Sequence, residues 1–141
     1  MRITAFALAV ASACTACTSM EGPSGRSSAT CRVGEPMVET QLFFGMNKPK
    51  GGVVGAAQWD AFVKREVVPR FPEGFSVLGG AGFWLDGQTK RTISEKSKVI
   101  VRMHADGADA DQAISAIIED YKTRFDQEAV LRVDRPVCAQ F

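Results

Sequence analysis

The sequence predicts an α+β domain in which two helices cover one face of a four-stranded antiparallel sheet. Two patterns lead to this fold class. Segments in which apolar and polar residues alternate indicate strands, and segments with apolar residues three and four positions apart indicate helices. These segments follow one another in the order β-α-β-β-α-β. A chain of 141 residues with 45% apolar and 23% charged side chains suits one domain of this kind.

The first half of the predicted domain is a strand followed by a helix. Apolar and polar residues alternate over 38–44, which is typical of a strand with one buried face. After a glycine-containing loop, apolar residues at helical spacing predict a helix over about 56–67. Pro69 prevents this helix from continuing beyond Val68, because proline has no N–H to donate.

Two further strands are expected in the middle of the domain. Residues 75–85 have an extended pattern, and the three glycines between 79 and 82 suggest a bulge or the close approach of another backbone. Asp86-Gly87 is a turn signal, and the polar residues 89–96 predict a long hairpin loop. Apolar and polar residues alternate again over 98–104, which predicts the third strand.

A helix and a strand complete the domain. Asp109 and Gln112 form a capping-box pattern, and one apolar stripe follows it, so a helix is expected over about 110–126. Residues 129–133 predict a fourth strand that ends at Asp134-Arg135-Pro136. Two β-α-β units with right-handed crossovers form a ferredoxin-like βαββαβ sandwich, in which the fourth strand lies antiparallel beside the first.

The N-terminal residues have the pattern of an export signal. Met1-Arg2 precedes the apolar run 3–13, which is too short to cross a hydrocarbon core of roughly 30 Å as a helix. Small residues lead into Cys14 and again into Cys17, as in the lipobox of bacterial lipoproteins. Cys17 is the favoured acylation site, because it allows a leader of more usual length, and Cys14 stays an alternative. Cleavage without lipid, after Ala13 or Ala16, is the other interpretation.

This pattern divides the chain into three parts. Residues 1–17 are expected to be a signal peptide of lipoprotein type, residues 18–36 a flexible tether rich in glycine, serine and proline, and residues 37–141 a single domain. We therefore expect a periplasmic protein of the bacterial cell envelope, attached to a membrane through an N-terminal lipid.

Cys31 and Cys138 lie near the two ends of the predicted domain. The periplasm permits disulfides, and the predicted topology brings the start of the first strand beside the end of the fourth. The sequence therefore predicts a Cys31–Cys138 bridge.

Charge and histidine content exclude several classes of function. The chain has 17 basic and 16 acidic residues, a net charge of +1, which argues against a protein that must neutralise nucleic-acid phosphates. His104 is the single histidine, so His-rich metal sites and most nucleophile systems that need an imidazole are excluded. No metal, cofactor or nucleic-acid partner is expected.

Alternation predicts which strand residues face the helices. The set expected under the helices is Val38, Thr40, Leu42, Phe44, Val99, Val101 and Met103, and the set expected on the open face is Glu39, Gln41, Phe43, Lys98, Ile100, Arg102 and His104. Glu39, Arg102 and His104 together could bind a small anion or a polar ring, with Glu39 or His104 as acid or base. A solvated or dimer-buried face with cross-strand ion pairs is the alternative.

Three further residues are candidates for ligand binding. Arg70 and Glu95 lie in predicted loops, where a charged side chain is more often simply solvated. Trp84 follows the glycines of the second strand and could line a pocket, although a tryptophan is first a core or interface residue.

Several stretches of the chain resemble a bacterial family of unknown function, domain of unknown function 3574. They are residues 39–45 (Glu-Thr-Gln-Leu-Phe-Phe-Gly), Trp59 and Phe62 leading to 68–74 (Val-Pro-Arg-Phe-Pro-Glu-Gly), 82–84 (Gly-Phe-Trp), 95–99 (Glu-Lys-Ser-Lys-Val) and 124–131 (Arg-Phe-Asp-Gln-Glu-Ala-Val-Leu). The resemblance implies a small exported domain, often lipid-anchored, and brings no activity. It marks Glu39, Arg70, Trp84, Glu95, Ser97 and Gln127 as motif residues without assigning them a role.

Two function hypotheses follow. In the first, a lipoprotein domain binds a small ligand, or a second copy of itself as a homodimer, through its open sheet face. In the second, the domain is a small cofactor-free enzyme in which Glu39, Arg102 or His104 transfers a proton on that face. The second hypothesis rests on fold analogy alone.

Overall fold

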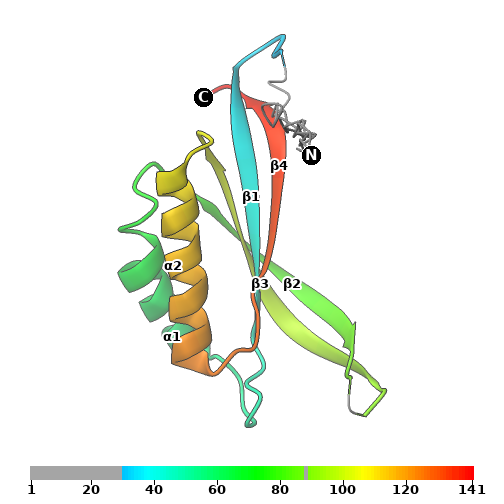
Figure 1. Cartoon of the computed structure of the whole chain (residues 1–141). Coiled ribbons are helices and arrows are strands. Elements are labelled where there is room, and N and C mark those ends of the chain that lie inside the picture. Colours follow the sequence, from blue (N-terminus) through cyan, green and yellow to red (C-terminus); the bar gives the residue numbers. More distant parts are fainter. Residues whose placement is uncertain (1–29, 88) are drawn as a thin grey trace, which may run out of the picture.

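The structure is a computed structural model that describes residues 30–87 and 89–141. Its elements are β1 (Glu35–Gly45), α1 (Ala56–Phe62), the π-helical segment η1 (Val63–Val67), β2 (Ser76–Leu85), β3 (Thr92–His104), α2 (Ala108–Phe125) and β4 (Leu131–Ala139). The sheet order is β2-β3-β1-β4 with every neighbouring pair antiparallel, and both helices lie on one face (Figure 1). The predicted ferredoxin-like α+β fold is confirmed. The predicted signal peptide, with Cys14 and Cys17, lies outside the described residues.

An aromatic cluster holds the helices on the sheet. The Phe62 side chain is fully buried, and its ring meets four others at centroid distances of 5.1–6.0 Å, most of them edge to face. These rings belong to Phe44 of β1, Trp59 of α1, and Tyr121 and Phe125 of α2. The cluster therefore joins β1 to both helices.

The helix predictions were correct in place and partly wrong in their ends. The first helix spans 56–67 as α1 and η1, and the Val68 N–H closes it on the Val63 carbonyl, five residues back. The second begins at Ala108 rather than at 110, with the extended Gly107 as N-cap and no side-chain cap, so the predicted capping box at Asp109 is wrong. Asp109 lies inside the first turn instead, where a carboxylate favours the helix dipole.

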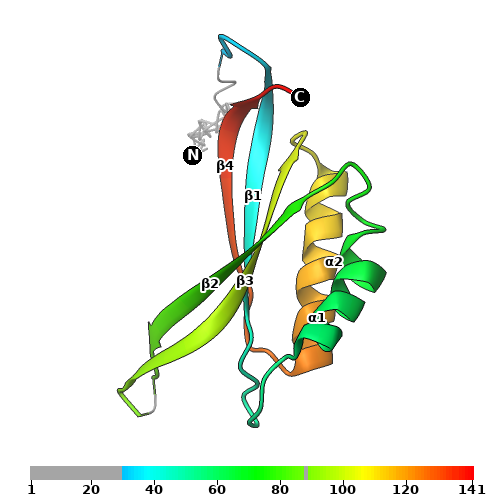
Figure 2. The same ribbon diagram turned by 180° about the vertical axis from the view of Figure 1, so that it is seen from behind.

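The predicted bulge and long hairpin loop are both wrong. β2 and β3 pair residue for residue from Ser76 opposite Val101 to Leu85 opposite Thr92, with no extra residue on either strand. Much of this hairpin extends beyond the helices (Figures 1 and 2). Both faces of the sheet are open there, so the mostly polar segment 92–97 can form a strand without burying its polar side chains. The close approach predicted at the glycines is to a side chain, since a Cβ on Gly80 would lie 3.1 Å from the Ser97 Oγ.

β4 continues beyond its predicted end. Pro136 was expected to terminate the strand, but it lies opposite Val38 within it, and pairing continues to Ala139 opposite Glu35. β4 is an edge strand, and an edge strand tolerates proline because the missing N–H can face away from the sheet.

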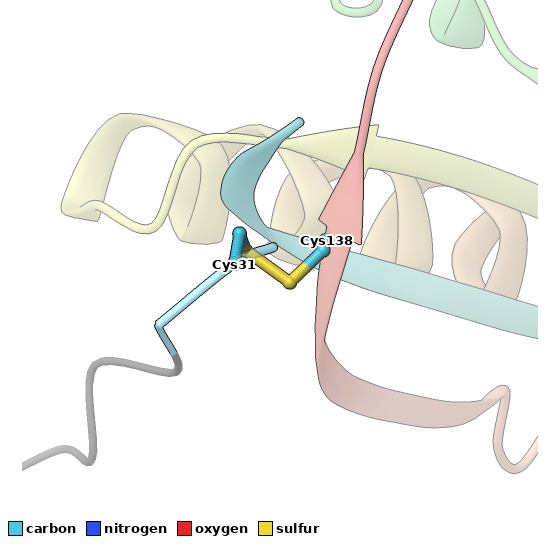
Figure 3. The surroundings of a disulfide bond; sticks show 2 residues. All are labelled: Cys31 and Cys138. Carbon is cyan, nitrogen blue, oxygen red and sulfur yellow. A yellow bond between two sulfur atoms is a disulfide. The ribbon is translucent and has the colours of Figure 1, made fainter. Parts of the chain in front are cut away.

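The predicted disulfide is confirmed. Cys31, just before β1, is bonded to Cys138 near the end of β4, with the two Cα atoms 5.6 Å apart (Figure 3). The antiparallel pairing of β1 with β4 brings these two ends of the domain together, as the topology predicted.

The predicted faces are correct for β1 and wrong for β3. In an antiparallel pair, residues directly opposite each other share a face. Arg102 lies opposite Thr40, and His104 lies opposite Val38, so both point to the helix side, where Arg102 is 8% and His104 3% exposed. Val99, Val101 and Met103 occupy the open face instead. Glu39, Arg102 and His104 therefore do not share one face, and Lys98 and Ile100 also belong to the helix side.

Candidate functional site

A cavity of about 530 Å³ lies between the end of β3, the turn before β2 and the start of α2. Its ionisable lining residues are Arg70, Glu73, Arg102, His104, Asp106 and Asp109, and the rest of the wall is proline, glycine and alanine. Small-molecule sites commonly have volumes of roughly 300–1,000 Å³. The cavity is thus large enough for a small ligand and polar enough to orient one.

Arg102 is the most unusual residue of this cavity. Its guanidinium lies over the Phe71 ring at 4.2 Å, a cation–π contact that helps to hold it. Its ion pair with the Glu73 Oε2 is long at 3.3 Å, and the Glu73 side chain is 78% exposed. The buried Arg102 Nε has no hydrogen-bond partner among the described residues. An unsatisfied buried donor costs about 1–3 kcal/mol, so an acceptor supplied by a ligand would be favoured here.

His104 is connected to a buried polar chain. Its Nδ1 donates to the Ala105 carbonyl at 2.8 Å, and its Nε2 lies 2.8 Å from the Thr40 Oγ1. The Thr40 hydroxyl donates to the Asp134 Oδ1 at 2.5 Å. Thr40 therefore links the imidazole of His104 to the carboxylate of Asp134 through two hydrogen bonds. This hydrogen-bonded chain begins at His104, which lines the cavity.

The ionised form of Asp134 supports this arrangement. Burial opposes ionisation of Asp134, but hydrogen bonds from Thr40 and Arg132 outweigh it and hold the pKa of the carboxyl below its ordinary value. Arg132 also pairs with Asp111 on α2 at 2.5 Å. The chain from His104 thus ends in an ion pair that joins β4 to α2.

Arg70 lines the cavity but has partners elsewhere. Its guanidinium pairs with Glu66 at 3.0 Å and with Asp120 at 2.9 Å, and Glu66 also pairs with Arg124 at 2.7 Å. The hydrogen bond from Arg70 holds the pKa of Glu66 below its ordinary value, against the effect of burial. Arg70 therefore holds η1 against α2. Of the two arginines in the cavity wall, Arg102 is the one with a buried donor that has no partner among the described residues.

The other predicted candidates lie away from the cavity. Glu39 is on the open face, where hydrogen bonds from Gln41 at 2.6 Å and Arg135 at 2.7 Å hold the pKa of its carboxyl below the ordinary value. Trp84, near the hairpin tip, is 47% exposed. Glu95 accepts the Asn47 N–H at 3.1 Å. Asn47 follows the end of β1, whereas the cavity lies near the start of that strand. The structure brings together only Arg70, Arg102 and His104.

A second cluster explains several residues of the resemblance motifs. A Cβ on Gly45 would lie 2.9 Å from the Glu95 Oε2, so the glycine leaves room for this carboxylate. Tyr121 donates to the Gly45 carbonyl at 2.7 Å, and Gln127 donates to the Asn47 carbonyl at 2.7 Å. Burial and, secondly, the charge of Glu95 raise the pKa of Tyr121. These contacts tie the end of β1 to β3 and to the end of α2.

Three ionisable residues of the cavity, Glu73, Asp106 and Asp109, were not predicted as site residues. Glu73 belongs to the turn before β2, which carries a motif of the resemblance but no pattern that indicates a ligand. Phe71 precedes it and stacks on Arg102 without lining the cavity. Gly107 was a local signal for the start of α2, because glycine is among the residues that commonly occupy the N-cap of a helix. The cavity itself depends on the β3 register, which local pattern does not determine.

The open face of the sheet is largely apolar. The alternate residues of all four strands contribute to it, and four exposed apolar side chains among them are Leu78, Trp84, Leu131 and Val133, with exposed fractions of 40–59%. Between them lie the partly buried Phe43, Val99, Val101 and Met103. The prediction of a mainly polar open face is therefore wrong, because it depended on the incorrect β3 face.

Comparisons with known proteins place the fold and leave the activity open. A family model described as "Protein of unknown function (DUF3574)" matches residues 39–141. No curated protein matches the chain. Among solved structures, a phage SAM lyase in complex with S-methyl-5'-thioadenosine is similar at 16% identity and a TM-score of 0.55, covering 79% of this chain and 97% of the other. The apo state of a phage SAM lyase is similar at 18% identity and a TM-score of 0.51, covering 81% and 98%.

Within 30–87 and 89–141, no helix has the length and the apolar content needed to cross a bilayer.

Proposed function

We propose that this chain, which belongs to the DUF3574 family of proteins of unknown function, is a binding domain that works as a homodimer joined through its open sheet face. The observation that carries this proposal is the row of exposed apolar side chains on that face, contributed by both edge strands of the sheet. Contiguous apolar patches on a protein surface commonly mark interaction sites.

A second copy of the chain is the partner that suits this face. A twofold interface places the same patch on both sides, and an apolar patch is complementary to itself. Two charged residues of this face, Glu39 of β1 and Arg135 of β4, already neutralise each other within one copy, with the Arg135 Nη2 and the Glu39 Oε1 2.7 Å apart. Pairing two such faces therefore buries apolar surface without bringing unpaired like charges together.

The oligomeric state of the disulfide-bonded mature chain tests this proposal. Light scattering coupled to gel filtration should give a dimer for the wild type, and Leu78→Glu should give a monomer, because a buried unpaired carboxylate is strongly unfavourable. Phe83→Glu is the matched control: Phe83 is 71% exposed on the same strand but points to the other face, so this variant should stay dimeric. A monomeric wild type at tens of micromolar would rule out the proposal.

The leader motif supports a membrane-tethered location for this domain. We propose that the mature chain begins at an acylated cysteine, Cys17 or else Cys14, and that the residues between this cysteine and the disulfide-bonded Cys31 hold the domain off the membrane of the cell envelope. Intact mass spectrometry of the exported protein should show a diacylglycerol-modified cysteine at the N-terminus. A mature chain that starts after Ala13 or Ala16 without added lipid mass would contradict this expectation.

A cofactor-free enzyme is the second candidate function. The chain from His104 through Thr40 to Asp134 favours it, because it places a hydrogen-bonded imidazole, a common acid–base group, next to a cavity of ligand size. Solved structures with the same fold belong to a lyase, which agrees with an enzymatic role without assigning one. In this candidate, proton transfer occurs at His104 in the cavity and not on the open sheet face.

A further inference from the structure

We propose that the cavity beside Arg102 binds a small zwitterion of amino-acid size, with the carboxylate on Arg102 and the ammonium group on the acidic rim. This site is separate from the open sheet face, so it does not depend on the dimer. It would supply the ligand of either candidate function.

The carboxylate position is defined by Arg102. Its side chain is only 9% exposed, it lines the cavity, and its Nε has no partner among the described residues. The guanidinium is a fork of donors that matches a carboxylate in a bidentate geometry. The stacking on Phe71 holds the fork in place before a ligand arrives.

Glu73 shows that a carboxylate can reach this guanidinium. Its contact with Arg102 uses one oxygen at 3.3 Å, which is longer than the roughly 2.7–2.9 Å of a good charge-assisted hydrogen bond. The Glu73 side chain is also 78% exposed, so it can move aside at little cost. A ligand carboxylate with better geometry would replace it.

The start of α2 contributes to the same position. Gly107 caps this 18-residue helix without a side-chain hydrogen bond, and Gly107, Ala108 and Ala110 all line the cavity. The first amides of a helix have no acceptor within the helix, and the helix dipole favours an anion there. With the buried Arg102 on the facing wall, these amides complete the donor set for a carboxylate.

The acidic rim argues for a zwitterion rather than a simple anion. Glu73, Asp106 and Asp109 line the cavity, and Arg70 on the same wall is already paired with Glu66 and Asp120. A dianion such as phosphate would meet these carboxylates at a cost. A carboxylate accompanied by an ammonium group pairs with both signs of charge, and the alanine and proline wall suits a small apolar side chain.

Three matched probes test the proposal on the full mature chain with its disulfide intact. L-Leucine carries both groups, 4-methylpentanoate lacks the ammonium group, and 3-methylbutylamine lacks the carboxylate. In amide-shift titrations by NMR at pH 7 and constant ionic strength, leucine should bind at least about tenfold more tightly than either analogue, the ratio expected for one charge-assisted contact. The shifted amides should be those of the cavity wall, including Ala108 and Ala110.

Two variants assign the two ends of the ligand. Arg102→Gln should weaken leucine binding about tenfold or more, because the amide cannot form a bidentate ion pair. Asp109→Asn is safer for the fold, since Asp109 is exposed, and it should reduce the preference for leucine over 4-methylpentanoate. Asp60→Asn, the same change at an exposed position of α1, is the control and should change neither affinity.

The results that would overturn the proposal are specific. Equal binding of leucine and 4-methylpentanoate would show a simple carboxylate site, and shifts outside the cavity wall, or none, would show no zwitterion site. The monomeric variant Leu78→Glu should bind leucine as the wild type does. A failure of the dimer therefore leaves this site intact, and a failure of this site leaves the dimer intact.

Discussion

Replacement of both Cys31 and Cys138 with serine is expected to lower the free energy of unfolding by about 4–5 kcal/mol. The bond closes a loop with a sequence separation of 107 residues, and constraining so long a loop removes much of the conformational entropy of the unfolded chain. It also joins the start of β1 to the end of the edge strand β4. Domains of this size commonly have a total stability of about 5–15 kcal/mol, so the loss is a large fraction.

Urea denaturation followed by circular dichroism measures this loss. The oxidised wild type, the reduced wild type and the double serine variant should be compared. Reduction should lower the stability of the wild type to that of the variant, and the reductant should leave the variant unchanged. A difference below about 1 kcal/mol between the oxidised wild type and the variant would contradict the entropic account.

Phe62→Ala is expected to lower the free energy of unfolding by about 3–5 kcal/mol. Phe62 is fully buried, and its ring meets the rings of Phe44, Trp59, Tyr121 and Phe125. Removing it opens a cavity at the point where α1, α2 and β1 meet. The surrounding rings can close this cavity only in part, because both helices are tied to the sheet through the same cluster.

Phe83→Ala is the matched control for this prediction. Phe83 is 71% exposed on the β2–β3 hairpin, so its truncation should change stability by no more than about 0.5 kcal/mol. Both variants can be measured by urea denaturation of the oxidised chain. If Phe62→Ala cost no more than Phe83→Ala, the aromatic cluster would not be the centre of the core.

Periodicity predicted the elements because it records burial directly. The alternation over 38–44 and the apolar stripe of the second helix reflect one buried face each, and both elements formed where expected. Their order was enough to predict the topology, and the topology was enough to pair Cys31 with Cys138. Element ends were predicted less well: β3 begins six residues earlier than expected because pairing with β2 extends the strand through a polar segment.

The candidate site shows where local pattern stops being informative. The alternation of β3 correctly separates Val99, Val101 and Met103 from Arg102 and His104, but it does not state which set faces the helices. The usual assumption puts the apolar set inside. Here the pairing with β1 puts Arg102 opposite the buried Thr40, and the apolar set lies on the open face.

The sequence by itself therefore determined the fold class, the order of the elements and the disulfide, since each depends on spacing along the chain. Only the tertiary structure decided that Arg102 and His104 line a cavity with the start of α2 and that the open face is apolar. The physical reason is that side chains alternate with a period of two. A strand thus has two complete faces. Its register with a neighbouring strand decides which face is buried, and in β1 and β3 this register joins residues about 60 positions apart.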